Sequence, residues 1–305
     1  GPGGVAIEVA ASGVNFIDVY QREGVYAITT PFVLGMECAG TVFAVGDGVT
    51  DVRVGDTVAS ADAIGSHATR CTAPAAGVVA VPDAIAAETA AAAMLQGMTA
   101  QYLLTSTYPV GEGTRLLIHA AAGGVGQLVV QLAKAKGAFV VATVGTAEKE
   151  RIAAARGADA VIRYDRGGDL AAAVREVSGG GVDVVYDGVG RATFDASLDS
   201  LRRRGMLVLF GAASGQVPPF DLQRLNRGGS LFVTRPTLAH YTATPQELRR
   251  RAGDVFASIA DGTLDVAIGG RYALEDAADA YRALEGRAST GKLLLEPGLP
   301  ASRPA

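Results

Sequence analysis

The stretch HAAAGGVGQL, from His119 to Leu128, decides the fold predicted for the middle of the chain. It follows the G-x-G-x-x-G pattern of dinucleotide-binding loops, with Gly123 and Gly126 at the second and third glycine positions and Ala121 at the first. The pattern follows an apolar strand and precedes a helical segment, the context in which such a loop holds a pyrophosphate at a helix N-terminus. Ala121 suits the loop if its φ is negative. The alternative interpretation is a tight strand-to-helix turn that binds no ligand.

Short apolar strands alternate with helical segments around this loop. Six such strands follow one another from Arg115 onward, namely RLLIHA, AFVVATV, DAVIRY, VDVVYD, GMLVLFG and GSLFVTR. Strands that are apolar throughout and separated by helices predict a parallel sheet covered on both faces. The last strand, near Leu231–Thr234, is expected at an edge of the sheet. The alternation also favours the dinucleotide interpretation of the loop.

The two ends of the chain have a sequence pattern that differs from this alternation of strands and helices. Residues 5–95 show short β-branched runs separated by Gly-Asp and Asp-Gly turns, and residues 272–297 read as a helix followed by a strand. We therefore expect an α/β protein in which a doubly wound parallel-sheet domain, 98–243, interrupts a β-rich domain made of 1–97 and 244–305. The terminal segment 297–305 is expected to be disordered. Because the chain starts inside a strand pattern, we also expect residues upstream of Gly1.

Composition limits the classes of function. The chain of 305 residues is 49% hydrophobic and 19% charged, as in globular proteins, and its net charge of −4 argues against a surface built for nucleic acid. Its two cysteines form no CxxC pair, so a disulfide framework is implausible. We find neither an apolar run long enough to span a membrane nor a signal peptide. A cytoplasmic protein without nucleic-acid partners is expected.

The end of the second strand of the α/β domain indicates which dinucleotide binds. NAD sites place an acidic residue about 20 residues beyond the loop, where it bonds a ribose hydroxyl. Here Gly145 and Thr146 stand at that place, and Lys149 follows. A carboxylate repels a 2′-phosphate, whereas a hydroxyl and an ammonium attract it, and Tyr164 can add a second hydroxyl from the third strand. NADP(H) is therefore predicted. The alternative is that Lys149 is only a solvated helix charge.

With these motifs in place, the chain resembles the zinc-independent, zeta-crystallin-like quinone oxidoreductases of the medium-chain dehydrogenase/reductase superfamily. The matching motifs run in the family order along nearly the whole chain: AASGVNFIDVY, GMECAGTV, VGDTV, LQGMTAQYLL, HAAAGGVGQ, TVGTAEK, VVYDGVG, RRRGMLVLFGAASG, LFVTRP and STGKLLL. The resemblance implies a GroES-like catalytic domain and a Rossmann NADP(H)-binding domain. It also implies hydride transfer from NADPH to a quinone or similar electron-poor carbonyl acceptor, and a homodimer formed through the edge strand.

The metal positions of the family also carry information. Zinc-dependent relatives have Cys, His and Cys where this chain has Asn15, Met36 and Gln96, which are poor zinc ligands. No metal site is therefore expected. Without a Lewis acid the protein cannot stabilise an alkoxide, so alcohol oxidation is disfavoured. Reduction of a quinone or a conjugated enone needs less help.

The resemblance also implies a set of cofactor contacts. Segments 211–214 and 236–238 lie at the carboxyl ends of predicted strands, where open α/β sheets bind ligands, and the segment 15–20 borders the nicotinamide side of the cleft. The predicted cofactor-binding residues are Phe16, Asp18, Tyr20, Tyr102, Gly123, Gly124, Val125, Gly126, Gly145, Thr146, Lys149, Tyr164, Val189, Gly211, Ala212, Ser214, Pro236 and Leu238.

Three residues are candidates for polarising the acceptor oxygen. Asn15 offers an amide, and Tyr20 and Tyr26 offer hydroxyl groups. Alternatively, Tyr26 is an aromatic wall and solvent supplies the proton. Among the histidines, His119 is expected to be a structural residue, while His67 and His240 stand alone in the sequence.

Three functions remain open. An NADPH-dependent quinone reductase is the main hypothesis. An enoyl or alkenal C=C reductase uses the same hydride geometry. A non-catalytic NADPH-binding sensor or structural protein is the third.

Overall fold

The computed structural model describes residues 1–302 and divides into two compact units. Unit 1 comprises Gly1–Met98 and the residues from Thr242 onward, and unit 2 comprises Thr99–Tyr241. Of the predicted disordered end, residues 303–305 lie outside the described part. Just before them, the backbone N–H and the hydroxyl of Ser302 donate hydrogen bonds to Asp276.

The sheet of unit 2 has six parallel strands, as predicted. Its order is β11-β10-β9-β6-β7-β8. From β6 the chain adds β7 and β8 on one side, and it then adds β9, β10 and β11 on the other side. The topological switch point, where such sheets bind ligands, therefore lies between β6 and β9. The strands are β6 (Arg115–Ile118), β7 (Phe139–Val144), β8 (Ala160–Arg163), β9 (Val182–Asp187), β10 (Leu201–Leu209) and β11 (Phe232–Thr234), which lies at the predicted edge.

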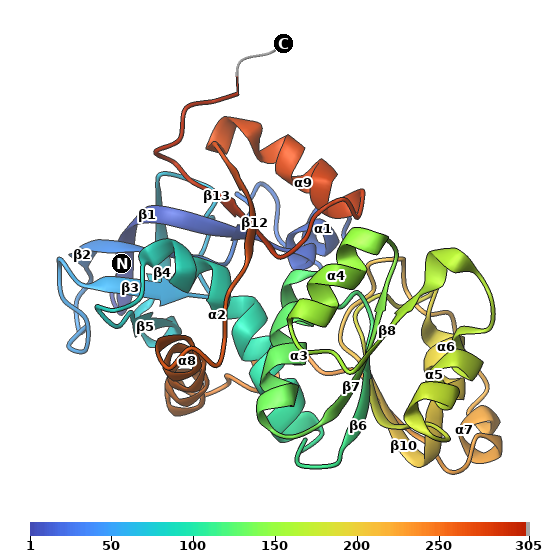
Figure 1. Ribbon diagram of the computed structural model, residues 1–305. Coiled ribbons are helices and arrows are strands. Elements are labelled where there is room, and N and C mark those ends of the chain that lie inside the picture. The colour runs from blue at the N-terminus through green and yellow to red at the C-terminus, as the bar shows by residue number, and fades with distance from the viewer. Residues whose placement is uncertain (303–305) are drawn as a thin grey trace. The chain divides into compact units, whose positions relative to one another are not determined.

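Helices cover both faces of this sheet. Figure 1 shows α3 and α4 on one side of it and α5, α6 and α7 on the other. Capping residues fix where two of them begin, because the side chains of Thr146 and Asp169 accept hydrogen bonds from the first turns of α4 and α5. The helices are α3 (Gly124–Ala135), α4 (Ala147–Ala155), α5 (Leu170–Ser178), α6 (Phe194–Asp199) and α7 (Gln223–Arg227).

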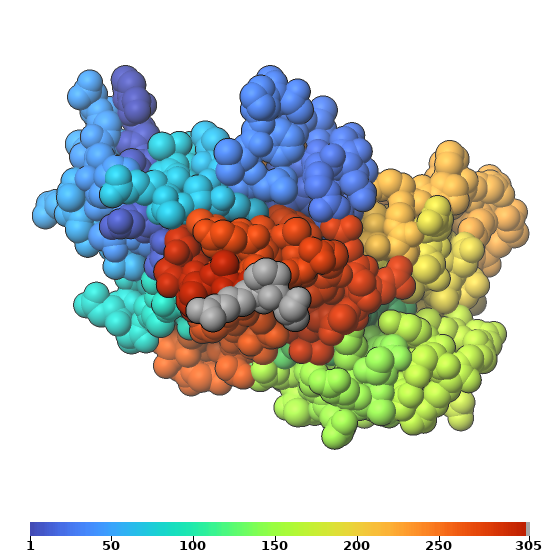
Figure 2. Space-filling view, turned by 90° about the horizontal axis from the view of Figure 1, so that it is seen from above, coloured from blue at the N-terminus to red at the C-terminus, as the bar shows by residue number. Residues whose placement is uncertain are grey.

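Unit 1 is built on a sheet of seven strands in the order β12-β13-β1-β2-β3-β5, with β4 paired to β1. The C-terminal strand β13 pairs antiparallel with β1, so the end of the chain returns to the first domain, as predicted. Figure 2 shows this C-terminal part, in orange and red, beside the blue and cyan N-terminal part. The strands are β1 (Gly4–Val14), β2 (Cys38–Val45), β3 (Thr57–Ser60), β4 (Arg70–Pro74), β5 (Val78–Ala80), β12 (Ile268–Tyr272) and β13 (Lys292–Leu295).

The helices of unit 1 include one that the sequence analysis did not identify. This helix, α1 (Phe16–Arg22), begins at Asn15, whose backbone N–H donates to the Asp18 carboxylate in a capping box. The other helices are α8 (Pro245–Ala260) and α9 (Ala277–Glu285), while α2 covers Ala87–Tyr102. Helices α2 and α8 have 16 residues each. Within residues 1–302, no helix has both the length and the hydropathy needed to cross a bilayer.

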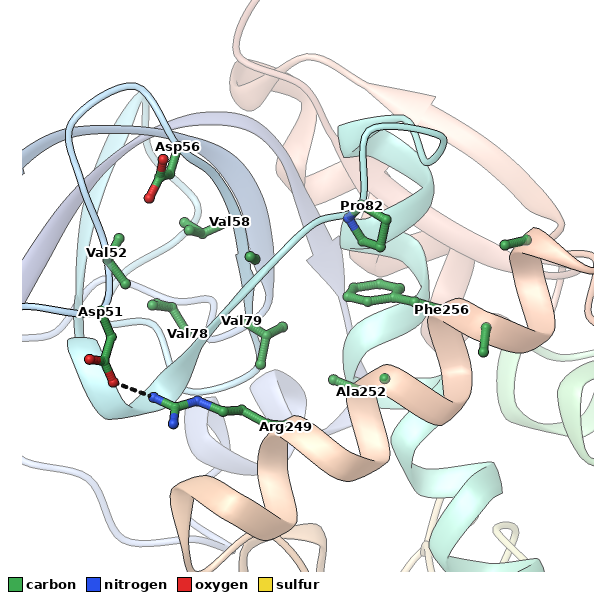
Figure 3. A pocket seen from close by; sticks show the side chains of 14 residues that line it. Asp51, Val52, Asp56, Val58, Val78, Val79, Pro82, Arg249, Ala252 and Phe256 are labelled. Carbon is green, nitrogen blue, oxygen red and sulfur yellow. Dashed lines mark hydrogen bonds and ion pairs between the residues drawn. The ribbon is translucent and has the colours of Figure 1, made fainter.

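A pocket of about 770 Å³ lies in unit 1 between α8 and the strands β3 and β5. Figure 3 shows apolar side chains such as Val79 and Phe256 lining it, and an ion pair of 2.9 Å between Arg249 and Asp51 at its side. None of the residues predicted to bind the cofactor or the acceptor lines this pocket.

Candidate active site

The glycine loop after β6 has a geometry that only small residues allow. A Cβ added to Gly126 would lie 2.4 Å from the carbonyl oxygen of Ala120 and 2.7 Å from Cα of Ala121, so a side chain there would push the helix away from the loop. The left-handed residue of the loop is Ala120, with φ 52°, and Ala121 is not in that region. Ala121 therefore has the negative φ that the dinucleotide-binding loop requires of it. The N–H groups of the first turn of α3, from Gly124 on, suit a phosphate group.

The structure brings together the four residues expected at the 2′-phosphate. Thr146 is the N-cap of α4, and its Oγ1 accepts a hydrogen bond of 3.2 Å from the backbone N–H of Lys149. A Cβ on Gly145 would lie 2.6 Å from the hydroxyl oxygen of Tyr164, so this hydroxyl packs directly against the glycine. Two hydroxyls thus lie at the carboxyl ends of β7 and β8, and Lys149 lies in the first turn of α4 that Thr146 caps. Residues of these types suit the 2′-phosphate of NADP(H). The ribose hydroxyl of NAD(H) is instead usually bonded by a carboxylate, and none stands here.

Two further loops meet backbone to backbone at the ends of β9 and β10. The backbone N–H and the hydroxyl of Ser214 each donate to the carbonyl oxygen of Val189, at 2.8 Å. A Cβ on Gly211 would lie 2.6 Å from the carbonyl oxygen of Gly188. Ala212 is buried beside them. The predicted residues of these loops therefore form one surface at this end of the sheet.

The remaining predicted residues of unit 2 lie in other surroundings. Tyr102, at the end of α2, is buried and stacks on Tyr241 with ring centroids 4.2 Å apart. Pro236 is buried after β11, and Leu238 begins a short 3-10 helix.

A buried polar chain at the ends of the strands was missed by the sequence analysis. Asp187, the last residue of β9, accepts hydrogen bonds from the backbone of Val189 and from the Ser197 hydroxyl. Ser197 contacts His119 Nε2 at 3.0 Å, and Thr143 contacts His119 Nδ1 at 2.8 Å. Burial lowers the pKa of His119, against the charge of Asp187. His119 is thus a satisfied structural residue, as expected.

In unit 1, Asn15 lies in a closed cluster with Glu37 and Lys292. Its amide donates to the carbonyl oxygen of Gly13 at 3.1 Å and to Glu37 Oε2 at 2.7 Å, and its Oδ1 accepts from Lys292 Nζ at 2.7 Å. Lys292 also forms an ion pair with Glu37, and the three side chains are almost fully buried. Both amide hydrogens of Asn15 are engaged, so this geometry favours a positioning role over donation to an acceptor.

A second series of hydrogen-bonded polar side chains ends at Asp18. The Oδ2 atom of Asp18 accepts hydrogen bonds from the backbone N–H of Asn15 at 2.9 Å and from the Tyr281 hydroxyl at 3.0 Å. Tyr281 also contacts His67 Nε2 at 2.7 Å, and His67 Nδ1 lies 2.8 Å from the Ser12 hydroxyl. The expectation that His67 stands alone is therefore wrong. Its partners are distant in sequence, and no local motif revealed them.

Burial changes the titration of two members of this chain. It raises the pKa of Asp18 to about 6, although hydrogen bonds from Asn15 and Tyr281 and the charge of Lys292 oppose the rise. Burial also lowers the pKa of His67 to about 4, and the charge of Lys292 acts in the same direction. Near pH 5 the folded protein therefore carries a neutral carboxyl group and a neutral imidazole here.

The Asp18→Asn substitution is expected to change how stability depends on pH. In the wild type, unfolding near pH 5 removes a proton from Asp18 and adds one to His67, so the two effects largely cancel. In the variant only His67 changes, because its folded pKa lies below its ordinary 6.5. Its contribution is present above pH 6.5 and is lost as the pH falls toward 4.

The matched variant His67→Gln leaves only Asp18, whose folded pKa is raised from 3.8. That contribution is present below pH 3.8 and is lost as the pH rises through about 6. Urea unfolding across this range measures both slopes relative to the wild type. Curves for the two variants that run parallel to the wild-type curve would contradict the assignment.

The predicted aromatic residues of α1 and the loop after it lie close to one another. The ring centroids of Tyr20 and Tyr26 are 5.8 Å apart in an edge-on arrangement, and Phe16 lies 6.2 Å from Tyr20. Tyr20 is buried, whereas Tyr26 is 43% exposed. Of the three acceptor-polarising candidates, Tyr26 is therefore the one whose side chain is open to a ligand.

The residues at the zinc-ligand positions do not fit a zinc ion. Asn15 is bonded to the buried ammonium of Lys292, which repels a second cation, and Met36 and Gln96 offer only a thioether and an amide. Within the part of the chain that the structure describes, no group of three or more His, Cys, Asp or Glu side chains can hold a metal ion.

Family models match both parts of the chain. The alcohol dehydrogenase GroES-like domain matches residues 1–111, and a zinc-binding dehydrogenase model matches residues 124–248. Asn15, Met36 and Gln96 all lie outside the second range.

Curated relatives match at high identity. Quinone oxidoreductase of Salmonella typhimurium is 46% identical over 298 residues, covering 96% of this chain and 91% of that protein. A 2-haloacrylate reductase of Burkholderia sp. is 40% identical over 306 residues, covering 97% and 92%.

Two solved structures are also similar to this chain, in fold as well as in sequence. Escherichia coli quinone oxidoreductase complexed with NADPH has a TM-score of 0.94 at 44% identity, and a mycobacterial protein complexed with NADPH has 0.95 at 50%. Each comparison covers 97% of this chain and 92% of the other. The GroES-like and Rossmann domains expected from the sequence are thus confirmed, and the chain belongs to the quinone oxidoreductase family of the medium-chain dehydrogenase/reductase superfamily.

Proposed function

We propose that this chain is an NADPH-dependent, zinc-independent quinone reductase. The observation that carries the proposal is the ammonium of Lys292, which is bonded to Glu37 and to Asn15, the residue that stands where zinc-dependent relatives have a cysteine ligand. A site neutralised in this way cannot stabilise an alkoxide through a metal, so a readily reduced acceptor suits it better than an alcohol. The names of the quinone oxidoreductases support the same substrate class.

We assign unit 2 to the cofactor and residues 1–97 with 244–305 to the acceptor. The first turn of α3 would hold the pyrophosphate of NADPH, and Thr146, Lys149 and Tyr164 would hold its 2′-phosphate. When bound, this cofactor supplies a hydride ion. The loops that contain Val189 and Ser214 would hold its nicotinamide half. Their backbone hydrogen bonds to each other keep them in place before any ligand arrives.

Residues of α1 and the loop after it would contact the acceptor. The exposed side chain of Tyr26 would hydrogen-bond a quinone oxygen through its hydroxyl, and the ring of Tyr20 packs edge-on against the Tyr26 ring. Asn15 acts by fixing the first turn of α1, through its capping contact with Asp18. We also propose that the protein works in the cytoplasm, without nucleic-acid partners.

The test compares two acceptors with NADPH as the reductant. A quinone reductase should have a higher kcat/KM with 1,2-naphthoquinone than with a trans-enoyl thioester. The opposite order would favour a C=C reductase, the alternative that the 40% identity to a 2-haloacrylate reductase supports. Tight NADPH binding without oxidation by any quinone would instead favour a non-catalytic sensor or structural protein.

The edge strand β11 is proposed as the homodimer interface. Phe232 on this strand is 55% exposed, and an open apolar edge pairs readily with a second strand. Phe232→Lys is therefore expected to convert a dimer into a monomer, because a charge on the edge opposes pairing. Leu222→Lys, at a site outside the strand that is 70% exposed, is the control. Light scattering that shows a dimer for Phe232→Lys, or a monomeric wild type, would contradict this interface.

A further inference from the structure

One buried carboxyl group holds the loop that follows β9. Asp187 is fully buried, and its Oδ1 accepts hydrogen bonds from the backbone N–H groups of Val189 at 2.8 Å and Gly190 at 3.0 Å. Its Oδ2 accepts from the hydroxyl groups of Thr193 and Ser197, each at 2.7 Å. Removing this side chain would leave these donors without their acceptor, which costs free energy where water cannot replace it. The side chain therefore fixes the course of the loop.

The main chain of Asp187 holds the loop that follows β10. Its carbonyl oxygen accepts hydrogen bonds from the N–H groups of Phe210 at 2.8 Å and Gly211 at 3.3 Å. Ser214 of this second loop is bonded in turn to the carbonyl oxygen of Val189. Both loops that we assign to the nicotinamide half of NADPH are therefore attached to one residue at the end of a strand of the sheet.

Ser197 connects Asp187 to the glycine loop. Because the hydroxyl of Ser197 donates its hydrogen to Asp187, it accepts a hydrogen bond from His119 Nε2 at 3.0 Å. The neutral imidazole then has its proton on Nε2, and its Nδ1 accepts from the Thr143 hydroxyl at 2.8 Å. His119 directly precedes the glycine loop, and the carbonyl oxygen of Thr143 accepts from the N–H of Ala121 at 3.2 Å. One series of hydrogen bonds thus runs beneath all these loops.

We propose that Asp187 is the positioning residue for the nicotinamide half of NADPH, and that Ser197 and His119 link it to the glycine loop that would hold the pyrophosphate. The inference rests on the proposed function, because that function assigns these loops to the cofactor. Both oxygens of Asp187 are occupied by groups of the protein, so the residue acts through the loops and not by contact with the cofactor. No proton is transferred, and the imidazole of His119 stays neutral.

The two halves of the cofactor should respond differently to a change at Asp187. Without its carboxylate, Val189 would still be bonded to Ser214, but the first loop would lose its side-chain attachment to the sheet. The contacts of His119 with Ser197 and Thr143 would stay in place, and so would the residues assigned to the 2′-phosphate. A reactant displaced by about 1 Å can react about 100-fold more slowly, so the loss should fall on the nicotinamide half.

Asp187→Ala tests the positioning role by isothermal titration of the ligand-free protein with two ligands. One is NADPH, and the other is adenosine 2′,5′-bisphosphate, which lacks the nicotinamide half. We expect the Kd of NADPH to rise about 10-fold or more, because several hydrogen bonds are lost, and the Kd of the bisphosphate to stay unchanged. Ser200→Ala is the control, since it removes a buried hydroxyl that bonds only to its own helix, at Ala196. It should bind both ligands as the wild type does.

Asp187→Asn is the conservative variant that should rescue NADPH binding. Its side-chain oxygen can still accept from the two backbone N–H groups, while its amide donates to Ser197. The hydrogen bonds beyond it then reverse, because Ser197 donates to His119 Nε2 and His119 Nδ1 donates to Thr143. We expect a Kd for NADPH within about 2-fold of the wild type. Nitrogen-15 NMR should show the His119 proton on Nε2 in the wild type and on Nδ1 in this variant.

Three results would overturn the proposal. They are equal losses for both ligands in Asp187→Ala, unchanged NADPH binding in that variant, and a wild-type His119 with its proton on Nδ1. If Asp187→Ala does not fold, Thr193→Val replaces it, because Thr193 is only half-buried and donates to both oxygens of Asp187. The same selective loss, of about 2- to 10-fold for NADPH alone, is then expected, and its absence contradicts the positioning role.

Failure of the proposed function gives a different result. A wild type that binds NADPH but oxidises it with no quinone would refute the quinone reductase. The selective loss in Asp187→Ala and the proton position on His119 would still decide the role of Asp187. A wild type that does not bind NADPH would overturn both proposals.

Discussion

Replacing Lys292 with methionine is expected to destabilise the protein by about 3–5 kcal/mol, the effect of removing one partner of a buried ion pair. Lys292 is 1% exposed and Glu37 is fully buried. Without the ammonium, the Glu37 carboxylate keeps only neutral donors, namely the amide of Asn15 and the backbone N–H of Leu95. Urea unfolding of the variant and the wild type measures the difference.

The double variant Glu37→Gln/Lys292→Met is the control for this result. It removes both charges together, so most of the lost stability should return. A single variant within about 0.5 kcal/mol of the wild type, the range of ordinary surface substitutions, would show that the pair is not the buried unit described here. A double variant as unstable as the single one would assign the loss to packing instead of charge.

Lys149→Ala is expected to weaken NADPH binding by about 1–3 kcal/mol, the loss of one charge-assisted contact. Binding of NADH should hardly change, because it has no 2′-phosphate for the ammonium to attract. Isothermal titration with both cofactors measures the two effects. Arg151→Ala, which removes a cation from an exposed position of the same helix, controls for the general loss of positive charge. Equal losses for both cofactors in Lys149→Ala would contradict the 2′-phosphate assignment.

Local sequence was sufficient to predict the parallel sheet, its edge strand and the tight glycine turn after β6. Apolar strands and helices alternate within short segments, and the role of Gly126 depends on neighbours only six residues away. Gly145, Thr146 and Tyr164 directly follow neighbouring strands, and Lys149 lies in the helix that Thr146 caps. Their role at the 2′-phosphate stays a prediction.

The polar cluster of unit 1 could not be predicted in this way. Lys292 and Asn15 are 277 residues apart, and Tyr281 reaches Asp18 across 263 residues. Asn15 therefore looked like an available amide donor in the sequence, and His67 looked isolated. The N-x-x-D pattern from Asn15 to Asp18 was the one local signal, and it would have identified α1 as a capped helix.

The most direct test of the proposed function is the rate of NADPH oxidation by the purified protein with 1,2-naphthoquinone, measured with and without a zinc chelator. We expect turnover that depends on the quinone, is unchanged by the chelator, and is much slower with NADH at the same concentration. An absence of turnover, or activity that the chelator abolishes and zinc restores, would contradict it.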